Sequence, residues 1–374
     1  MNKNTTYNIV FKPYSVFSQF DSVKEYWKLL LRKCPHYYSQ SWGWIETWIK
    51  NLPPDCNLSL IVGFINDSPV IAFFLGSKTI IRHRFFRIRQ ISLNSTLIEH
   101  IDNATHIEYN TILIDPNLTI SINYLLKNLP LKWDEFYMQR CAPSQQFNFL
   151  IKDISDYKYN ITTTKQKSYF VNLDQVRQNN NDYLSLLSQN RRKQILRSLK
   201  KYEKKMGKLK IHIADNPNDA LNIYQELIEM HQKRWTKRGH PGSFSNEYPL
   251  YFYKELITKQ FEHGEILLMK ISAGSYTIGC LYHYIYNKKV MGLLSGLNYL
   301  PENFFLPGLV CVYYAVLHNA TAGFECYDLM EGDFQQKRSL STNSHELDDI
   351  LVTKKNLKYY TEKFAVMLYR IYKP

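Results

Sequence analysis

Apolar and polar positions along the first half of the chain follow patterns that predict both helices and strands. Apolar runs are separated by turn-forming segments such as Asn66-Asp67-Ser68-Pro69, which indicates antiparallel strands joined by hairpins. The expected elements, in order, are a strand at 7–11, a helix at 23–33, a helix around 41–49, strands at 58–64, 70–77 and 85–93, and a helix and strand leading to 133–140.

The helix around 41–49 carries an aromatic stripe, because Trp44, Ile45 and Trp48 recur on one side. Such a stripe is more typical of a core-packing face than of an aromatic cage, and we interpret it as core. From Pro143 to Lys167 the sequence becomes polar and rich in Tyr and Thr. We therefore expect the chain to cross there from one domain to the next.

The second half shows clearer periodicity and clearer helix boundaries. Asn216 and Pro217 supply the cap and first-turn proline of one helix, and Gly207 ends the helix before it. The expected elements are helices at 184–206, 217–237, 248–263 and 309–322, and strands at 209–214, 265–272, 276–286, 290–299 and 324–330. Three of these strands form a meander, so the order predicts an α+β fold.

The length of 374 residues is natural for two domains, which we place at 1–160 and 164–374. The most apolar stretches are too short to cross a membrane, and the N-terminus has no apolar signal run, so we expect a soluble, cytoplasmic protein. The six Cys are far apart and form no CxxC motif. We expect neither a metal site nor a disulfide framework.

The formal charge of +14 is concentrated in the second half of the chain, where a run of basic residues follows Asn190. Between Arg191 and Lys210 this run has ten Lys and Arg side chains against one acid, Glu203. One interpretation is the solvated face of an amphipathic helix, and the other is a surface that binds phosphate groups. The charge favours an anionic partner such as a nucleotide, a phosphopantetheine carrier or RNA, without choosing among them.

A second candidate anion site lies where the helix at 309–322 begins. Pro307 and Gly308 precede Leu309, so this helix start offers free backbone N–H groups at the positive end of the helix dipole. A pyrophosphate or phosphopantetheine phosphate suits such a position. The alternative is that Pro307 and Gly308 mark only a helix boundary.

Ionisable residues cluster directly after the strand at 324–330. Asp328, Glu331, Asp333 and Lys337 follow one another at the end of an apolar strand, where crowded charges favour a functional site over a simple cap or ion pair. His231 lies on the inner side of the helix at 217–237, four residues before Trp235. It is either a core histidine or, with Arg234, part of a substrate cleft.

These motifs occur together in the order of a known family. Asn190-Arg191-Arg192-Lys193, His231-Gln232-Lys233-Arg234-Trp235, Pro307-Gly308, and Tyr327-Asp328-Leu329 with Gly332-Asp333 and Lys337 resemble the CelD-like/BioF-like acetyltransferase family of the GNAT superfamily, which is related to the Fem aminoacyl transferases. The early Ser41-Trp42 element, with Trp44 and Trp48, is similar as well. The resemblance implies tandem GNAT-like domains, each a twisted mixed sheet flanked by helices.

The resemblance also implies an N-acyltransferase without a metal, which moves an acyl group from a thioester on CoA or on a phosphopantetheine carrier to a small-molecule or peptide amine. It places the donor between the strands at 290–299 and 324–330. The implied donor contacts are Leu294, Ser295, Gly296, Pro307, Gly308 and Leu309, the implied acceptor contacts are Arg191, Arg192, Arg234 and Trp235, and the implied catalytic residues are Asp328, Asp333, Lys337 and His231.

Within that mechanism we expect backbone N–H groups near Leu294–Gly296 to polarise the thioester and a tyrosine, Tyr313 or Tyr314, to protonate the leaving thiolate. Phe334-Gln335-Gln336 and the single Pro307-Gly308 depart from the family pattern. Two alternatives therefore stay open, namely an aminoacyl-tRNA donor and a non-catalytic binding module.

Overall fold

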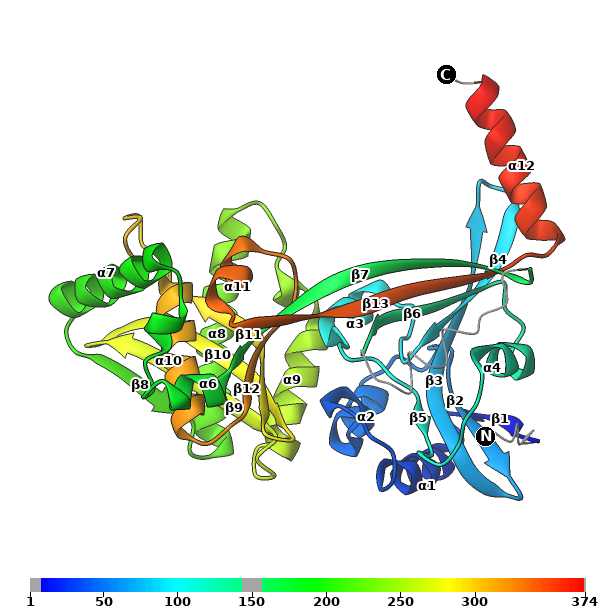
Figure 1. The fold of residues 1–374 in the computed structure, drawn as a ribbon, viewed down its shortest axis with the longest axis horizontal. Coiled ribbons are helices and arrows are strands. Elements are labelled where there is room, and N and C mark those ends of the chain that lie inside the picture. The colour runs from blue at the N-terminus through cyan, green and yellow to red at the C-terminus, as the bar shows by residue number, and fades with distance from the viewer. Residues whose placement is uncertain (1–7, 143–156, 373–374) are drawn as a thin grey trace. The chain divides into compact units, whose positions relative to one another are not determined.

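The computed structural model describes residues 8–142 and 157–372, and the chain groups into two compact units (Figure 1). Unit 1 takes residues 1–166 and 346–374, and unit 2 takes residues 167–345. This division differs from the expected domains, 1–160 and 164–374, at the C-terminal end. The difference arises because β13 (Asn343–Lys354) pairs with β6 (Glu135–Cys141) and so completes the sheet of unit 1.

The sheet of unit 1 has the strand order β1-β2-β3-β4-β6-β13-β7. Its strands besides β6 and β13 are β1 (Val10–Ser15), β2 (Leu58–Ile65), β3 (Ser68–Arg82), β4 (Phe86–Leu93), the short β5 (Leu113–Ile114) and the first part of β7 (Tyr159–Asn172). Its helices are α1 (Phe20–Leu31), α2 (Trp42–Lys50), α3 (Glu99–Thr105), α4 (Ile122–Asn128) and α12 (Leu357–Tyr372).

Both faces of this sheet are covered, because neighbouring strand residues point to opposite sides. On one face Phe74 contacts Trp27 of α1 and Trp48 of α2, with ring centroids 4.7 and 5.7 Å apart. On the other face Phe73 belongs to a core with Trp133. The aromatic stripe of α2 is therefore a core face, as the sequence predicted.

In unit 2 the strand order of the sheet is β7-β12-β11-β10-β9-β8. Its further strands are β8 (Leu209–Ile213), β9 (Ile266–Ala273), β10 (Tyr276–Tyr286), β11 (Lys289–Leu297) and β12 (Cys326–Glu331). Its helices are α6 (Leu173–Gln178), α7 (Gln189–Met206), α8 (Pro217–Lys237), α9 (Glu247–Gln260), α10 (Pro307–Thr321) and α11 (Gln335–Leu340). The α+β prediction and the helix–meander–helix–strand order of the second half are confirmed.

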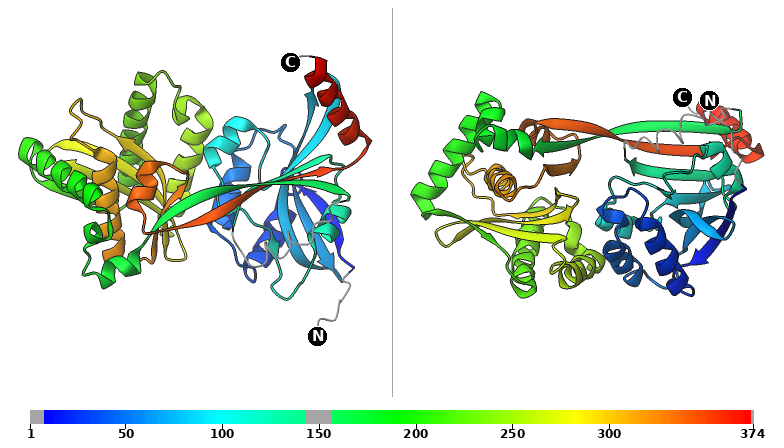
Figure 2. Two further views of the ribbon diagram at one scale, coloured as in Figure 1. Left: turned by 45° about the horizontal axis from the view of Figure 1, so that its top comes forward. Right: turned by 60° about the horizontal axis from the view of Figure 1, so that its bottom comes forward.

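Helices cover both faces of the unit 2 sheet, with α7 and α10 on one side and α8 and α9 on the other (Figure 2). The first side has an apolar core that includes Ile195 of α7 and Val316 of α10. On the second side Tyr224 and Tyr253 contact Tyr282 of β10 through their rings. Within the described residues, no helix is both long enough and apolar enough to cross a membrane.

The strands of the two units follow the same plan but differ at one step. In each unit four neighbouring strands pair antiparallel, and the fourth then pairs in parallel with a fifth. The fifth strand pairs antiparallel with a sixth. In unit 1, the parallel pair β4–β6 ends at Ser92, and β4 itself ends at Leu93. In unit 2, β11 continues from Met291, its last residue paired with β12, to Leu297. Only the second arrangement leaves a long strand edge open for a ligand.

Candidate functional site

The opening between β11 and β12 contains a cavity of about 290 Å³, which we call the splay cavity. The two strands run parallel and pair only from Lys289 to Met291 on β11, and then separate. A register shift in the pairing with β10 makes a bulge at Leu293, because Tyr282 pairs with Leu294 and His283 pairs with Gly292. Besides β11 and β12, β10, α10 and α11 supply wall residues, so all the elements around the opening contribute to it.

A buried histidine–tyrosine pair forms part of the wall of the splay cavity. The Nδ1 atom of His283 lies 3.3 Å from the Leu267 carbonyl oxygen, and its Nε2 atom lies 3.0 Å from the Tyr327 hydroxyl oxygen. A carbonyl can only accept a hydrogen bond, so Nδ1 carries the proton and Nε2 accepts from the tyrosine. Burial lowers the pKa of His283 to about 4 and raises the pKa of Tyr327. The imidazole is therefore neutral at neutral pH.

A second cavity of about 400 Å³, the α10 cavity, lies at the N-terminal end of α10. Pro307 and Gly308 form its wall with Arg191 and Arg197 of α7. The Nε atom of Arg191 is buried and has no hydrogen-bond partner within the described residues. Burial lowers the pKa of this guanidinium. A positive helix end and an unsatisfied guanidinium donor make this cavity suited to an anion.

A third cavity of about 340 Å³, the α8 cavity, lies between the C-terminal end of α8 and the residues after β11. Its basic wall residues are Lys233, Arg234, Lys237 and Arg238. The guanidinium of Arg234 lies 4.2 Å from the centre of the Tyr299 ring, and its buried Nε has no hydrogen-bond partner within the described residues. No acidic side chain lies among the described residues that line this cavity, so it too favours an anionic group.

The three cavities share wall residues. Tyr299 lines all three, while Gly308 and Gln336 line both the splay cavity and the α10 cavity. Arg234 and Leu297 line both the splay cavity and the α8 cavity. Two positively charged approaches therefore meet at the opening between β11 and β12.

Comparison with known proteins identifies this part of the chain. A family model described as "Acetyltransferase (GNAT) domain" matches residues 189–338, which include α7 to α10, the first part of α11 and every wall residue of the three cavities except Leu340. We refer to this part of the chain, residues 189–338, as the GNAT domain after that match. No curated protein matches the chain.

Solved structures similar to the chain agree in fold. A structure of FemX superposes with a TM-score of 0.55 at 10% sequence identity, covering 94% of this chain and 99% of FemX. A conserved protein of unknown function from Bacteroides thetaiotaomicron VPI-5482 superposes with a TM-score of 0.50 at 10% identity, covering 93% of this chain and 100% of that chain. These similarities show the two-unit fold and, at such low identity, nothing about substrate.

The GNAT domain brings some of the predicted site residues together. Leu294, Ser295, Gly308, Arg234 and Lys337 line the splay cavity. Arg191, Pro307 and Leu309 line the α10 cavity, together with Gly308. The Lys337 ammonium donates to the carbonyl oxygens of Met330 and Glu331, at 3.2 and 2.6 Å, so it also holds the end of β12 in place.

The two predicted aspartates lie elsewhere. Asp328 is 3% exposed and accepts hydrogen bonds from the Met330 backbone N–H at 2.7 Å and the Ser168 hydroxyl at 3.4 Å. Its neighbours Tyr327 and Leu329 face the splay cavity, so strand alternation directs Asp328 away from it. Asp333 is exposed, and hydrogen bonds from Tyr169 and Arg338 lower its pKa. Neither aspartate is placed to accept a proton in the cavity.

Four other predicted site residues, namely Arg192, Gly296, His231 and Trp235, make contacts within the fold. Arg192 donates to the carbonyl oxygens of Leu184 and Ser185, at 3.0 and 3.1 Å. Gly296 allows α8 to pack against β11, because a Cβ atom there would lie 2.3 Å from the Leu227 carbonyl oxygen. His231 contacts Phe244 and Trp235 through its ring, with centroids 5.1 and 6.0 Å apart, on the α8 side of the sheet.

Tyr313 and Tyr314, the expected thiolate acids, pack against the apolar core on α10 and are not among the described residues that line the cavities. The sequence interpretation also missed His283 and the hydroxyl of Tyr327. The available signal was a histidine inside the otherwise apolar strand Tyr276–Tyr286, which resembles a core residue until its two partners are known.

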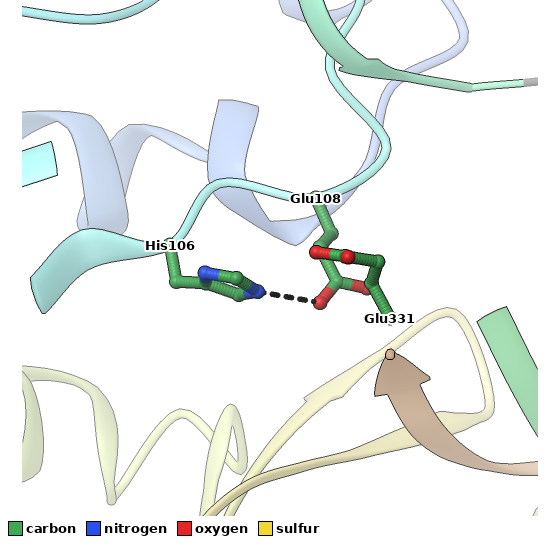
Figure 3. A group of neighbouring side chains, drawn as sticks. All are labelled: His106, Glu108 and Glu331. Atoms are coloured by element: carbon green, nitrogen blue, oxygen red, sulfur yellow. Dashed lines mark ion pairs between the residues drawn. The ribbon is translucent and has the colours of Figure 1, made fainter. Parts of the chain in front are cut away.

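Unit 1 contains a histidine–carboxylate pair of its own. The Nε2 atom of His106 lies 3.0 Å from the Glu108 carboxylate, which is buried (Figure 3). His106 has a φ of 39° and ends α3 as its left-handed cap. The pair therefore fixes the turn after α3. Glu331, drawn in the same view, belongs to unit 2, where it ends β12.

Proposed function

We propose that the GNAT domain transfers an acyl group from a thioester, on CoA or on a phosphopantetheine carrier, to an amine. The observation that carries this proposal is the splay cavity. It lies beside a strand edge that is open from Gly292 to Leu297, and a charged approach leads to it from each side. A narrow acyl-bearing arm enters through one approach and an amine enters through the other.

The donor enters over the α10 cavity. Its phosphates meet the backbone N–H of Gly308 at the start of α10 and the guanidinium of Arg191, and its arm passes Gly308 into the splay cavity. Glycine suits this passage, because a Cβ atom at Gly308 would lie 2.8 Å from the Gln336 side-chain amide. Backbone N–H groups on the open edge of β11, around Leu294, polarise the thioester carbonyl.

The acceptor enters through the α8 cavity. Arg234 and its basic neighbours Lys233, Lys237 and Arg238 bind an anionic group on the acceptor, such as a carboxylate or phosphate. Like charge also keeps a second ammonium group out of this approach. The reacting amine then reaches the splay cavity past Tyr299, which lines both spaces.

The proton of the attacking amine passes to the His283–Tyr327 pair. The neutral amine forms the C–N bond, its proton moves to the Tyr327 oxygen, and the tyrosine proton moves to Nε2 of His283. When the C–S bond breaks, the thiolate leaves, and the proton returns from His283 through Tyr327 to the sulfur. The amide and the free thiol are the products, and the pair ends in its starting state.

An aminoacyl-tRNA donor remains the second candidate, and α7 is the observation that favours it. Arg197, Lys201 and Lys205 of α7 lie 5.6, 5.2 and 5.4 Å from the centre of the Phe304 ring, beside the α10 cavity. Cations around a half-buried aromatic ring suit a nucleic-acid end as well as a CoA nucleotide. RNA binding whose affinity falls steeply with salt would favour this donor.

Thermal unfolding with and without CoA and acetyl-CoA tests the main proposal. We expect both ligands to raise the melting temperature in a saturable way. Gly308→Leu, which fills the passage between the α10 and splay cavities, abolishes that rise. Ala322→Leu adds the same side chain at the exposed far end of α10 and leaves the rise intact.

Two results would contradict the proposal. The first is an unchanged melting temperature of the wild-type chain with either ligand, together with an acyl transfer assay that shows no amide product. This result would overturn the CoA proposal and favour aminoacyl-tRNA as the donor. A shift that survives in Gly308→Leu would place the donor outside these cavities.

A further inference from the structure

The C-terminal helix α12 of unit 1 exposes a continuous apolar stripe. The stripe residues are Leu357, Tyr360, Phe364, Met367, Leu368 and Ile371, which are 79, 56, 58, 51, 37 and 65% exposed. At about 100° per residue, these positions fall within roughly 100° of arc on one side of the helix. A contiguous exposed apolar surface of this kind marks an interaction site.

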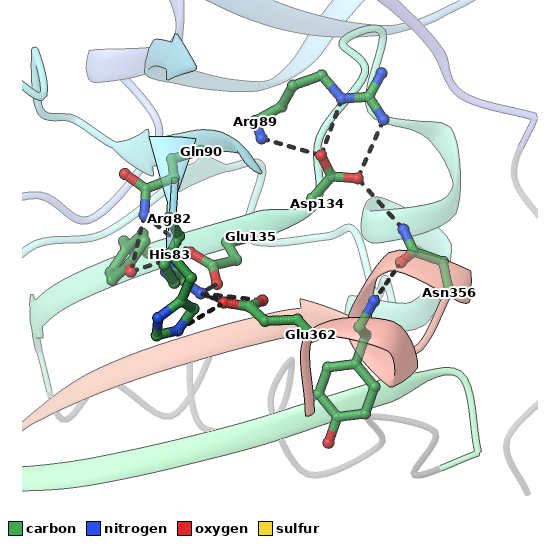
Figure 4. A network of polar contacts seen from close by, with 10 residues as sticks. Arg82, His83, Arg89, Gln90, Asp134, Glu135, Asn356 and Glu362 are labelled. Carbon is green, nitrogen blue, oxygen red and sulfur yellow. Dashed lines mark hydrogen bonds and ion pairs between the residues drawn. The ribbon is translucent and has the colours of Figure 1, made fainter. Parts of the chain in front are cut away.

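Polar contacts hold the opposite side of α12 against the sheet (Figure 4). Glu362 accepts from Arg82 of β3 at 3.2 Å, and Arg82 also forms a bidentate pair with buried Glu135 at 2.9 Å. Lys358 donates to the Asp134 carboxylate at 3.1 Å. The helix is therefore anchored through its charged side, and its apolar side is directed outward.

Asn356 continues this anchor at the start of the helix. Its side-chain amide donates to Asp134 at 3.3 Å, and its side-chain oxygen caps the helix by accepting from the Tyr359 backbone N–H at 3.1 Å. Burial raises the pKa of Asp134, but hydrogen bonds from Arg89 and Lys358 outweigh it and hold the pKa below its ordinary value. The docked orientation of α12 is thus fixed by charged and capping contacts.

A neighbouring hairpin extends the same surface. The tip between β3 and β4 exposes Ile81 at 67% and Phe85 at 83%. It lies beside α12, because Lys358 donates to the Arg87 carbonyl oxygen at 3.0 Å and His83 lies 3.7 Å from Glu362. Helix and hairpin therefore present apolar side chains from two elements of one unit.

Positive charge surrounds these apolar residues. Arg82, Arg89 and Lys358 pair with acidic side chains of unit 1. Arg84 and Arg87 of the hairpin and Lys363 of the helix are exposed. Two copies of this surface would bring like charges together. An anionic lipid surface instead neutralises the charge and takes the apolar side chains into its interfacial layer.

We propose that α12 and the β3–β4 hairpin form a docking surface for an anionic membrane. The helix lies in the plane of the interface with its stripe inserted among the lipid chains. The exposed side chains of Arg84, Arg87 and Lys363 contact the head groups. This attachment is peripheral and does not require any part of the chain to cross the membrane.

Co-sedimentation of the full chain with lipid vesicles tests the proposal. We expect binding to vesicles that contain phosphatidylglycerol and at least about tenfold weaker binding to vesicles of phosphatidylcholine alone. Phe364→Glu, which places a charge in the stripe, lowers affinity for the anionic vesicles by at least about tenfold. Ala365→Glu adds the same charge at an exposed position of the same helix, outside the stripe, and changes affinity by no more than about threefold.

Three results would overturn the proposal. The first is an absence of binding to either vesicle by the wild-type chain, whose folding is checked by its melting temperature. The second is an equal loss in Phe364→Glu and Ala365→Glu, which would indicate charge alone. The third is a concentration-dependent dimer in analytical ultracentrifugation that Phe364→Glu dissolves, which would assign the stripe to a second copy of the chain.

Discussion

At the residue scale, the mechanism proposed for the GNAT domain depends on the position of one hydroxyl group, that of Tyr327. Tyr327 donates to His283 and lines the splay cavity, whereas the hydroxyl-bearing ring of Tyr313 packs on α10 away from it. Tyr327→Phe removes the first proton acceptor and keeps the ring. We expect turnover with an acyl-CoA and an amine to fall about a hundredfold, with donor affinity unchanged.

Tyr313→Phe is the matched control, because it removes a tyrosine hydroxyl from the same domain without touching the cavity. We expect its turnover to stay near that of the wild type. Steady-state kinetics and a donor titration on both variants check the prediction. Equal turnover in Tyr327→Phe and the wild type would remove the pair from the mechanism.

Burial of His283 also makes unit 2 sensitive to pH. The unfolded imidazole binds a proton below its ordinary pKa of 6.5, but the folded one binds it only below about 4. Stability is therefore complete above pH 6.5 and falls as the pH drops towards 4, by roughly 3 kcal/mol in total. Urea unfolding at several pH values between 6.5 and 4 measures this loss of stability. Between pH 6.5 and 4, His283→Gln should lose roughly 3 kcal/mol less unfolding free energy than the wild type. An equal loss in both chains would contradict the assigned protonation.

At the element scale, the sequence predicted helices whose ends have chemical markers. The Asn216 cap with Pro217 correctly located α8, and Pro307 with Gly308 correctly located α10. The predicted crossing segment, Pro143–Lys167, lies partly outside the described residues. Its later part belongs to β7, where exposed polar residues such as Thr163 and Thr164 resemble loop sequence. Hydrophobic pattern alone cannot identify a strand that buries so few side chains.

The candidate site was harder to predict, because it depends on which face of a strand each side chain occupies. Asp328 was chosen for its acidity, yet Tyr327 and Leu329 on either side of it face the splay cavity. The alternation was readable in the sequence, but the choice of face was set by α10 packing on that side. The glycines were equally ambiguous, since Gly308 borders a cavity whereas Gly296 admits a helix.

Gly296 gives the clearest prediction about how elements fit together. A Cβ atom at this position would lie 2.3 Å from the Leu227 carbonyl oxygen and 2.6 Å from the Leu227 Cα. These are backbone atoms, which cannot move away by a rotamer change as a side chain can. Gly296→Ala therefore forces α8 away from β11 and lowers the free energy of unfolding by about 3 kcal/mol. Urea denaturation measures the change.

Ser295→Ala is the control for that substitution, because it changes the adjacent residue of the same strand without adding volume. Its cost should stay within about 1 kcal/mol. If Gly296→Ala proved as stable as the wild type, the close approach of α8 to β11 would not be required for packing.

At the scale of the whole molecule, the two units depend on chain segments that are far apart in sequence. The chain leaves unit 1 in β7 and returns to it in β13, whose residues from Asp348 to Thr353 pair with β6. Leu347, Ile350 and Val352 of this strand are at most 2% exposed. A boundary placed by the order of elements alone assigns this strand to the second domain. Only the pairing with β6 assigns it to the first.

A chain that ends at His345 should therefore lose unit 1 and keep unit 2. Exposing three large apolar side chains costs roughly 5 kcal/mol, which is comparable to the whole stability of a typical domain. The sheet from β7 to β8 retains all of its strands in this truncated chain. Hydrogen exchange should show lost protection in β2, β3 and β6 and retained protection in β9, β10 and β11.

A chain that ends at Asn356 separates the strand from the helix that follows it. It lacks α12 but retains β13, and Asp134 and Glu135 still have their partners Arg89 and Arg82. We expect unit 1 to keep its exchange protection in this chain and to lose only the membrane attachment proposed for α12. If the chain ending at His345 also kept unit 1 protected, β13 would be dispensable to that core. If it lost protection in β9–β11 as well, the two units would unfold as one.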